Sequence, residues 1–417
     1  MKIRFLVKKV AYNALFIWPS KLSHQVLINR IRSRGQARVV FFASNLSMWR
    51  YQSLMEMMME DARFEVRLII APFKFYSEEL SRSSVARLRA YFEAKGIDYT
   101  DITQTSGMDP EFLKDFHPDL LFYPQQYSHM LDDSVDFSAF RNRLVCFYPY
   151  GLSTFDTAWQ SALRMTNTAW KLFFPSVAHK INAQKWLYGK GDNIVVVGDP
   201  DYDRFMASSD DSVWKKQDRR KKRIIWAPHF TISSGGKFSR DSFLWLHSIM
   251  LDLAKKHSDE IQIAFKPHPH LLGALYSHPD WGKQRADSYY ETWANLPNGQ
   301  LEDGDFIDLF NTSDALIHDC GSFTAEYLYT AKPVMFVSTH IETELGQLSD
   351  FGKMALNAHY HGSSESDVAS FIENVVLGGS DTKAPERQSF RTNYLVPPGG
   401  KGVAESTYED IVNSLWG

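Results

Sequence analysis

A chain of 417 residues is long enough for two domains of ordinary size. Its hydrophobic fraction of 44% is typical of globular rather than disordered proteins, and a formal net charge of −3 gives no overall attraction to nucleic acid. No apolar run approaches the roughly 18 residues that a membrane-spanning helix needs. The two cysteines, Cys146 and Cys320, are far apart in sequence and are expected to remain free thiols. The composition therefore favours a soluble enzyme core.

The amino-terminal segment, residues 1–37, is basic and contains no acidic residue. Nine lysines and arginines lie within the first 38 positions, and they alternate with apolar side chains such as Phe16 and Trp18. A segment of this kind can lie in the headgroup plane of an anionic membrane, or it can pack on the body of the protein. We expect a membrane-surface anchor that can be removed without loss of folding, since the first core strand begins at Val39.

Two series of apolar runs separated by helix-length segments follow this leader. Strands of the first series are expected at 39–43, 64–70, 119–123 and 144–148, with helices at 49–61 and 77–95. Strands of the second series are expected at 194–197, 223–226, 261–265, 315–317 and 333–337, with helices at 243–256 and 324–330. This alternation indicates parallel strands joined by right-handed crossovers.

The sequence therefore predicts an α/β fold of two Rossmann-like, doubly wound domains that face a cleft. Residues 38–188 would form an acceptor domain and residues 189–375 a nucleotide-donor domain. Residues 376–417 would pack back on the acceptor domain, and a hinge is expected near residues 175–192.

Polar residues follow neighbouring strands of the second series. His229 ends one apolar run, and Lys266 and His268 end the next, whereas His270 lies one residue further on and is expected to face solvent. The carboxyl ends of parallel strands are where ligands bind in such sheets. A lone histidine there is often only a local hydrogen-bond partner, but two of them on one sheet indicate a site.

A third strand of this series runs into a helix start that suits an anion. Asp319 follows the strand, and Gly321 and Ser322 precede the expected helix, whose free N–H groups and dipole favour a diphosphate. Glu326 lies one turn after Ser322, so both should face the same way, and it could accept hydrogen bonds from a ribose diol. Alternatively, Glu326 is a plain acid near a helix start.

The acidic segment Gly198-Asp-Pro-Asp-Tyr-Asp203 also invites a metal-binding interpretation. Hard cations need several oxygens that converge from one turn, and Pro200 interrupts this segment. We expect a turn in which Asp203 begins the following helix, because Asp is a favoured N-cap residue.

The order of these motifs resembles that of the CDP-glycerol glycerophosphotransferases, from about residue 190 to 340. The matching segments are Gly198-Asp-Pro, Trp226-Ala-Pro-His, Phe265-Lys-Pro-His-Pro and Ser313-Asp-Ala-Leu-Ile-His-Asp-Cys-Gly-Ser, with Glu326. The resemblance implies a two-domain fold of the GT-B type and a role in making teichoic-acid-like, capsule-like or related cell-surface polymers. It also assigns contacts with the donor pyrophosphate and ribose to four residues: His268, Asp319, Ser322 and Glu326.

The chain departs from the family pattern at two places. Gly321 shifts the His318-Asp-Cys-Gly-Ser322 segment toward the Asp-Ser-Gly-Gly form of UDP-GlcNAc 2-epimerases, which share the fold. In the other domain, Tyr150 stands where the family often has the histidine of a His-Gly-Thr motif. A neutral phenol with a pKa of about 10 is a poorer base than histidine. The base is therefore Tyr150, His229 or another group.

We interpret the chain as a transferase that moves a glycerophosphate-type group from a CDP-activated donor to a lipid-linked or polysaccharide acceptor, releasing CMP. Lys266 and His268 would offset diphosphate charge, so no tightly bound cofactor is expected; a divalent metal is compatible with this chemistry but not indicated. The enzyme would be cytoplasmic and peripheral at the inner face of the cell membrane. The alternatives are a nucleotide-sugar glycosyltransferase and a UDP-sugar 2-epimerase-like isomerase, which would convert its substrate without an acceptor.

Overall fold

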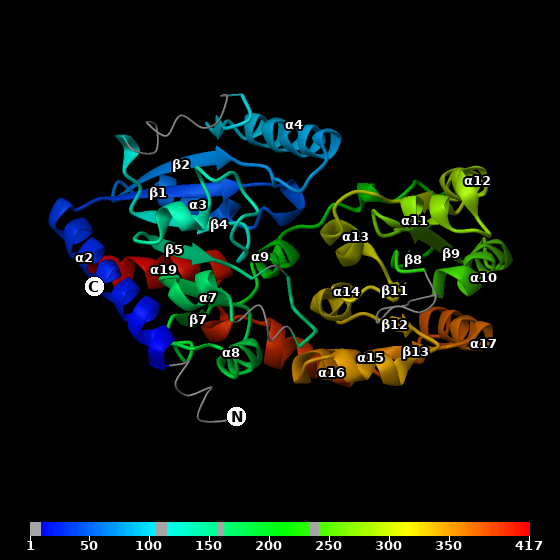
Figure 1. The fold of residues 1–417 in the computed structure, drawn as a ribbon. Coiled ribbons are helices and arrows are strands. Elements are labelled where there is room, and N and C mark those ends of the chain that lie inside the picture. The colour runs from blue at the N-terminus through cyan, green and yellow to red at the C-terminus, as the bar shows by residue number, and fades with distance from the viewer. Residues whose placement is uncertain (1–9, 105–114, 150, 157–161, 233–241) are drawn as a thin grey trace. The chain divides into compact units, whose positions relative to one another are not determined.

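The protein consists of two compact units, seen in a computed structural model that describes residues 10–104, 115–149, 151–156, 162–232 and 242–417 (Figure 1). Unit 1 comprises residues 1–151, 157–203 and 396–417, and unit 2 comprises residues 152–156 and 204–395. The longer of the two segments of unit 2 thus begins at Arg204. Residues 175–192, where the hinge is expected, lie inside unit 1.

Unit 1 is built on a seven-stranded parallel sheet with the order β3-β2-β1-β4-β5-β6-β7. Its strands are β1 (Ala37–Ala43), β2 (Phe64–Ile70), β3 (Thr100–Asp101), β4 (Leu120–Tyr123), β5 (Leu144–Phe147), β6 (Lys171–Phe174) and β7 (Ile194–Val196). Its helices are α2 (Trp18–Arg34), α3 (Gln52–Met59), α4 (Glu78–Ala94), α7 (Arg164–Thr168), α8 (Val177–Gln184) and α19 (Val403–Trp416). β7 was assigned to the second series from sequence, but it pairs with β6 and belongs to this sheet.

Both faces of this sheet are covered, which is why its strands are almost continuously apolar. Side chains of α2, α3, α4 and α19 pack on one face, and side chains of α7 and α8 pack on the other. At the centre, Phe41 of β1 is in register with Phe122 of β4, and their stacked rings have centroids 4.4 Å apart.

The amino-terminal helix is part of unit 1 rather than a separable leader. A helical turn at Asn13–Ile17 leads into α2, which ends at Gly35 in the left-handed conformation, with φ 73°. Three α2 side chains are buried in the core cluster: Leu27, Ile28 and Ile31. Deletion of residues 1–37 would remove these core side chains, which argues against the expectation that it leaves folding intact.

The acidic segment 198–203 anchors the carboxyl-terminal helix. The carboxylate of Asp203 accepts hydrogen bonds from the main-chain N–H groups of Val403 (2.8 Å) and Ala404 (3.0 Å), so it caps α19. Asp203 was expected to begin the helix that follows it, but that helix, α9 (Asp201–Met206), begins two residues earlier. Arg50 pairs with both Asp199 (2.9 Å) and Asp201 (3.0 Å), so this segment has a structural role.

Unit 2 is built on a six-stranded parallel sheet with the order β10-β9-β8-β11-β12-β13. Its strands are β8 (Lys222–Ala227), β9 (Ile261–Phe265), β10 (Gly299–Leu301), β11 (Ala315–His318), β12 (Val334–Val337) and β13 (Tyr360–Gly362). Its helices are α10 (Ser242–Lys256), α11 (Leu271–Ser277), α12 (Gly282–Asn295), α13 (Ile307–Thr312), α14 (Phe323–Glu326), α15 (Ile341–Gln347), α16 (Asp350–Asn357), α17 (Glu365–Ser370) and α18 (Ala384–Phe390). Trp226, Phe243, Phe265 and Trp293 form the aromatic centre of its core.

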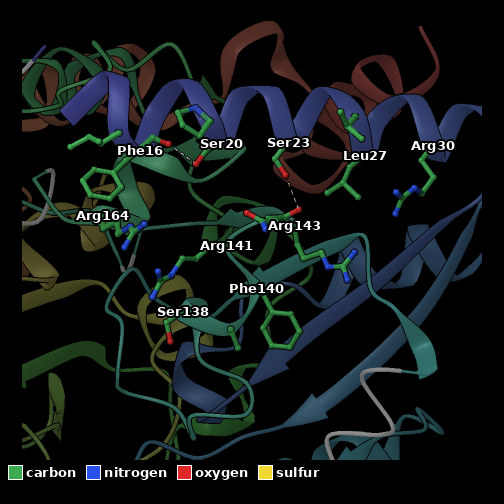
Figure 2. A pocket seen from close by; sticks show the side chains of 15 residues that line it. Phe16, Ser20, Ser23, Leu27, Arg30, Ser138, Phe140, Arg141, Arg143 and Arg164 are labelled. Carbon is green, nitrogen blue, oxygen red and sulfur yellow. Dashed lines mark hydrogen bonds between the residues drawn. The ribbon is translucent and has the colours of Figure 1, made fainter. Parts of the chain in front are cut away.

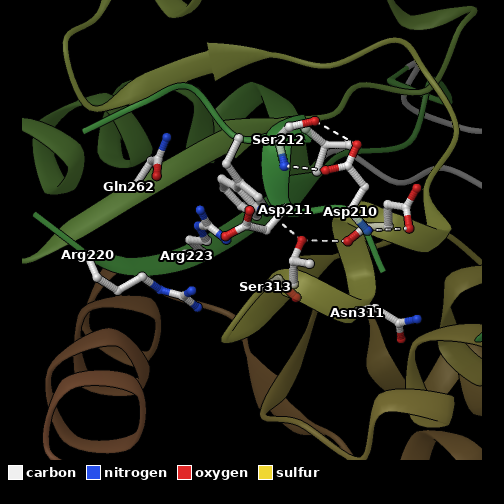
Figure 3. Close-up of polar contacts among 12 residues, drawn as sticks. Asp210, Asp211, Ser212, Arg220, Arg223, Gln262, Asn311 and Ser313 are labelled. Atoms are coloured by element: carbon white, nitrogen blue, oxygen red, sulfur yellow. Dashed lines mark hydrogen bonds and ion pairs between the residues drawn. The ribbon is translucent and has the colours of Figure 1, made fainter. Parts of the chain in front are cut away.

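Polar contacts hold residues 210–214, which precede β8, against the rest of unit 2 (Figure 3). Asp210 accepts from the N–H of Ser212 (2.8 Å), and its own N–H donates to Asp308 (3.2 Å). The guanidinium of Arg223 lies over the ring of Trp214, 5.3 Å from its centroid. These contacts hold the entry into β8, the strand that leads to His229. Within the described residues, no helix is long and apolar enough to cross a bilayer.

Candidate functional site

The carboxyl ends of β8 and β9 bring two of the candidate histidines together. The strands are paired in register at Trp226 and Phe265, and beyond the strands the N–H of His268 donates to the carbonyl of Pro228 (3.0 Å). The ring centroids of His229 and His268 are 5.0 Å apart. The two polar strand ends therefore lie close together, as their positions in the sequence indicate.

Both imidazole rings are held by the same local contact. The main-chain N–H of Thr231 donates to Nδ1 of His229 (3.3 Å), and that of His270 donates to Nδ1 of His268 (3.1 Å). A neutral ring whose Nδ1 accepts a hydrogen bond carries its proton on Nε2. In this tautomer, the proton of each ring is on Nε2.

Burial decides the charge of His268. Desolvation, together with the charge of His270, lowers the pKa of His268 to about 4. Phe230 contributes to this desolvation, since its ring centroid lies 4.5 Å from that of His268. At neutral pH and without a bound ligand, His268 is therefore an uncharged hydrogen-bond donor.

Lys266 is also buried, and its ammonium points to a neighbouring loop. Its Nζ donates to the carbonyl of Gly304 (2.6 Å). Burial lowers the pKa of Lys266, while the carboxylates of Glu302, Asp305 and Asp303 raise it. The charge of Lys266 is thus directed at the acidic loop after β10.

Asp319 connects three elements at the centre of the site. Its Oδ1 accepts from the N–H of His229 (2.6 Å), and its Oδ2 accepts from the hydroxyl of Ser242 at the start of α10. The residue is 1% exposed, so these contacts lie inside the protein. Asp319 therefore positions His229. No pattern in the sequence indicates that Ser242 contacts Asp319, because the two residues are 77 positions apart.

Ser322 and Glu326 are one helical turn apart, but their surroundings differ. The N–H of Glu326 donates to the carbonyl of Ser322 (3.4 Å) at the start of α14. Ser322 is exposed, and its side chain makes no capping hydrogen bond, whereas Glu326 is 5% exposed. The two side chains therefore differ in exposure, with that of Glu326 inside the protein.

Gly321 is fixed by a segment that sequence reasoning missed. Its carbonyl accepts from the hydroxyl of Thr154 (3.1 Å), and the carbonyl of Thr154 accepts from the N–H (2.9 Å) and hydroxyl (3.0 Å) of Ser349. A Cβ at Gly352 would lie 2.0 Å from the same carbonyl, so this position requires glycine. No local pattern predicts this contact, because Thr154 and Gly321 are 167 residues apart.

A pair of buried histidines supports the same loop. The rings of His318 and His359 have centroids 5.4 Å apart. His318 contacts the carbonyl of Cys320 through Nδ1 (3.1 Å), and His359 contacts that of Ala355 (2.9 Å). Burial keeps the pKa of His359 well below its usual value. Tyr150, the remaining candidate, lies outside the described residues, and the described residues contain no cluster of His, Cys, Asp and Glu that could hold a metal ion.

Residues 154–395 match the protein family described as CDP-Glycerol:Poly(glycerophosphate) glycerophosphotransferase. No curated protein matches the chain. Among solved structures, a variant of the wall teichoic acid polymerase TagF is similar to 99% of this chain and 97% of its own, with a TM-score of 0.62 and 12% identity. A crystal of this variant soaked with CDPG gives the same coverage and identity, with a TM-score of 0.57.

UDP-GlcNAc 2-epimerase from Neisseria meningitidis, bound to UDP-GlcNAc, is similar to 91% of this chain and 100% of its own, with a TM-score of 0.56 and 14% identity. At such low identity, the solved structures bear on the fold alone. They confirm the expected α/β fold of the GT-B type.

Proposed function

Because the chain belongs to the CDP-glycerol glycerophosphotransferase family, and is thus an enzyme that transfers glycerophosphate from CDP-glycerol, we propose that unit 2 binds this donor at the carboxyl ends of β8, β9 and β11. The observation that carries the proposal is the pair of Nε2–H donors of His229 and His268 beside the Asp319 loop. Ligands bind at this edge of parallel sheets.

The diphosphate would accept hydrogen bonds from His229, His268 and the hydroxyl of Ser322. Hydrogen bonds to charged acceptors contribute roughly twice as much as neutral ones, so uncharged donors suffice to hold an anion. Glu326 would contact the ribose. Lys266 and Asp319 would act indirectly, Lys266 by fixing the loop at Gly304 and Asp319 by fixing the main chain of His229.

In the reaction, an acceptor hydroxyl oxygen forms a bond to the phosphorus that carries glycerol. The bond from that phosphorus to the bridging oxygen breaks, and CMP leaves with the electron pair. The hydrogen-bond donors stabilise the charge that develops on the leaving phosphate. Because Nδ1 of both His229 and His268 accepts a main-chain hydrogen bond, their neutral rings are donors rather than proton acceptors. This favours Tyr150, or a group other than these two histidines, as the base.

We further propose that the acceptor is a lipid-linked or growing polymer and that the enzyme works at the inner face of the cell membrane. The wall polymerase TagF, which shares the fold, supports a polymer acceptor. The basic segment 1–37 supports a membrane location.

Acceptor dependence tests the proposal. With CDP-glycerol and a glycerophosphate-primed lipid acceptor, CMP should appear together with a lengthened acceptor, and the donor should remain intact without acceptor. Gly321 and the likeness to UDP-GlcNAc 2-epimerases favour one other candidate, an isomerase. Conversion of UDP-GlcNAc without acceptor, with CDP-glycerol left unchanged, would establish that candidate and refute ours.

A further inference from the structure

A cavity of about 640 Å³ lies in unit 1 between α2 and residues 138–143 (Figure 2). Its position in the fold separates it from the transfer chemistry. Residues 138–143 precede β5, Arg164 precedes β6, and α2 precedes β1. The cavity therefore lies at the amino edge of the parallel sheet, opposite the edge where substrates of such folds bind.

The lining of this cavity is strongly basic. Its described residues include neither Asp nor Glu, and they include four arginines, seen in Figure 2: Arg30, Arg141, Arg143 and Arg164. The nearby carboxylate of Asp119 already accepts from Arg34 and from the N–H of Arg38 (2.8 Å). Four positive charges that share a cavity without a carboxylate to neutralise them favour the binding of an anion.

Two hydroxyls of the cavity are occupied by main-chain carbonyls, and the arginines supply all of its charged groups. The hydroxyl of Ser20 donates to the carbonyl of Phe16 (2.8 Å), and that of Ser23 donates to the carbonyl of Asn142 (3.3 Å). The guanidinium of Arg164 lies over the ring of Phe16, 4.4 Å from its centroid. This stacking fixes Arg164 while its planar N–H edge remains suited to a phosphate.

An apolar stripe runs along the helix beside this cavity. Four large apolar side chains are 57–71% exposed there: Leu15, Trp18, Leu22 and Val26. Their spacing of three or four residues places them on one face. Leu15 and Val26 also line the cavity, so the stripe and the arginines are contiguous. A ligand that satisfies both has a phosphate and an apolar part.

We propose that this cavity binds the phosphate of an anionic phospholipid, while the adjacent stripe of Leu15, Trp18, Leu22 and Val26 enters the bilayer. Trp18 suits this position, because tryptophan favours the interface between headgroups and hydrocarbon. The inference rests on the proposed function in placing the acceptor at a membrane. It assigns the membrane contact to a site folded into unit 1, in place of a detachable leader.

Flotation of the full-length protein with phospholipid vesicles tests this proposal. Phosphatidylcholine vesicles with and without phosphatidylglycerol would be compared for the wild type and for the double variant Arg141→Gln/Arg164→Gln. Each removed charge should lower the partition coefficient about fivefold, and the double variant about 25-fold, on phosphatidylglycerol vesicles only. The matched control is Arg82→Gln/Arg87→Gln, which removes two exposed arginines from α4 and should change partitioning less than twofold.

Leu22→Ser tests the contribution of the apolar stripe. Because salt screens only the attraction between charges, this variant should weaken the vesicle binding that persists at high salt. Thermal melting would verify that each variant is folded. Arg164→Gln could disturb the packing on Phe16, whereas Arg141 is exposed. Arg141→Gln alone should therefore still lower the partition coefficient about fivefold. Equal losses in the α4 control would overturn the proposal, since attraction would then be nonspecific. Displacement by millimolar glycerol phosphate would mean that the cavity binds free phosphate compounds, and displacement by soluble poly(glycerophosphate) that it binds an acidic polymer.

The assay contains no donor. Loss of lipid binding and loss of glycerophosphate transfer are therefore separate results.

Discussion

Replacement of Asp319 by alanine separates a positioning role from direct contact with the donor. The carboxylate holds the N–H of His229 at 2.6 Å and the hydroxyl of Ser242, and it is 1% exposed. A hydrogen bond to a charged group contributes about 1.5–3 kcal/mol, so the loss of two such bonds in Asp319→Ala should destabilise unit 2 by about 3–6 kcal/mol. Asparagine can keep both contacts without the charge, and Asp319→Asn should lower stability by only about 1–2 kcal/mol.

Urea unfolding followed by tryptophan fluorescence measures these differences, since Trp226 and Trp293 are buried in unit 2. CDP binding to the folded variants would be measured by calorimetry. Asp252→Ala, an exposed aspartate on α10, is the matched control and should change stability by less than about 0.5 kcal/mol. If Asp319→Ala keeps wild-type stability but loses CDP affinity, Asp319 contacts the nucleotide and the positioning argument is refuted.

Three further predictions concern the site. His268→Ala and Ser322→Ala should each weaken CDP binding by about 1.5–3 kcal/mol without unfolding unit 2, and wild-type affinity in calorimetry would remove them from the donor site. Tyr150→Phe should lower kcat with nearly unchanged donor affinity, whereas His229→Gln should mainly weaken donor affinity. If His229→Gln instead loses the lower limb of the pH–rate profile, His229 is the base. His359 has a folded-state pKa well below its unfolded value of 6.5, so only the unfolded state takes up its proton and stability falls as pH drops below about 6.5. Chemical unfolding at pH 6 and pH 5 measures how steeply the free energy of unfolding falls with pH. His359→Gln should reduce this pH dependence by up to about 1.4 kcal/mol per pH unit. An unchanged pH dependence would contradict a lowered pKa of His359 in the folded state.

Most of the buried strands could be predicted from sequence, although β6 was missed. β1, β8 and β9 are largely apolar and buried, which is typical of strands inside a parallel sheet. β10 and β13 were missed, because Gly299-Gln-Leu301 and Tyr360-His-Gly362 are three-residue edge strands without an apolar run. Only pairing with β9 and β12 makes them strands.

The site was predictable as far as the polar ends of the strands. Parallel pairing brings His229 and His268 together wherever their strands are neighbours. The contacts of Asp319 with Ser242 and of Gly321 with Thr154 join residues distant in sequence, so no local pattern could reveal them.

The amino-terminal helix shows a further limit of sequence patterns. An apolar face fits a bilayer and a protein core equally well. In α2, Leu27 and Ile31 face the core, whereas Leu22 is exposed. Only the fold distinguishes these two apolar faces of one helix.

A crystal structure with CDP-glycerol bound tests the central claim most directly. We predict diphosphate oxygens within about 3 Å of the Nε2 atoms of both His229 and His268, at the carboxyl ends of β8 and β9. A nucleotide bound at any other place on unit 2, or a diphosphate that faces neither Nε2 atom, would contradict the account.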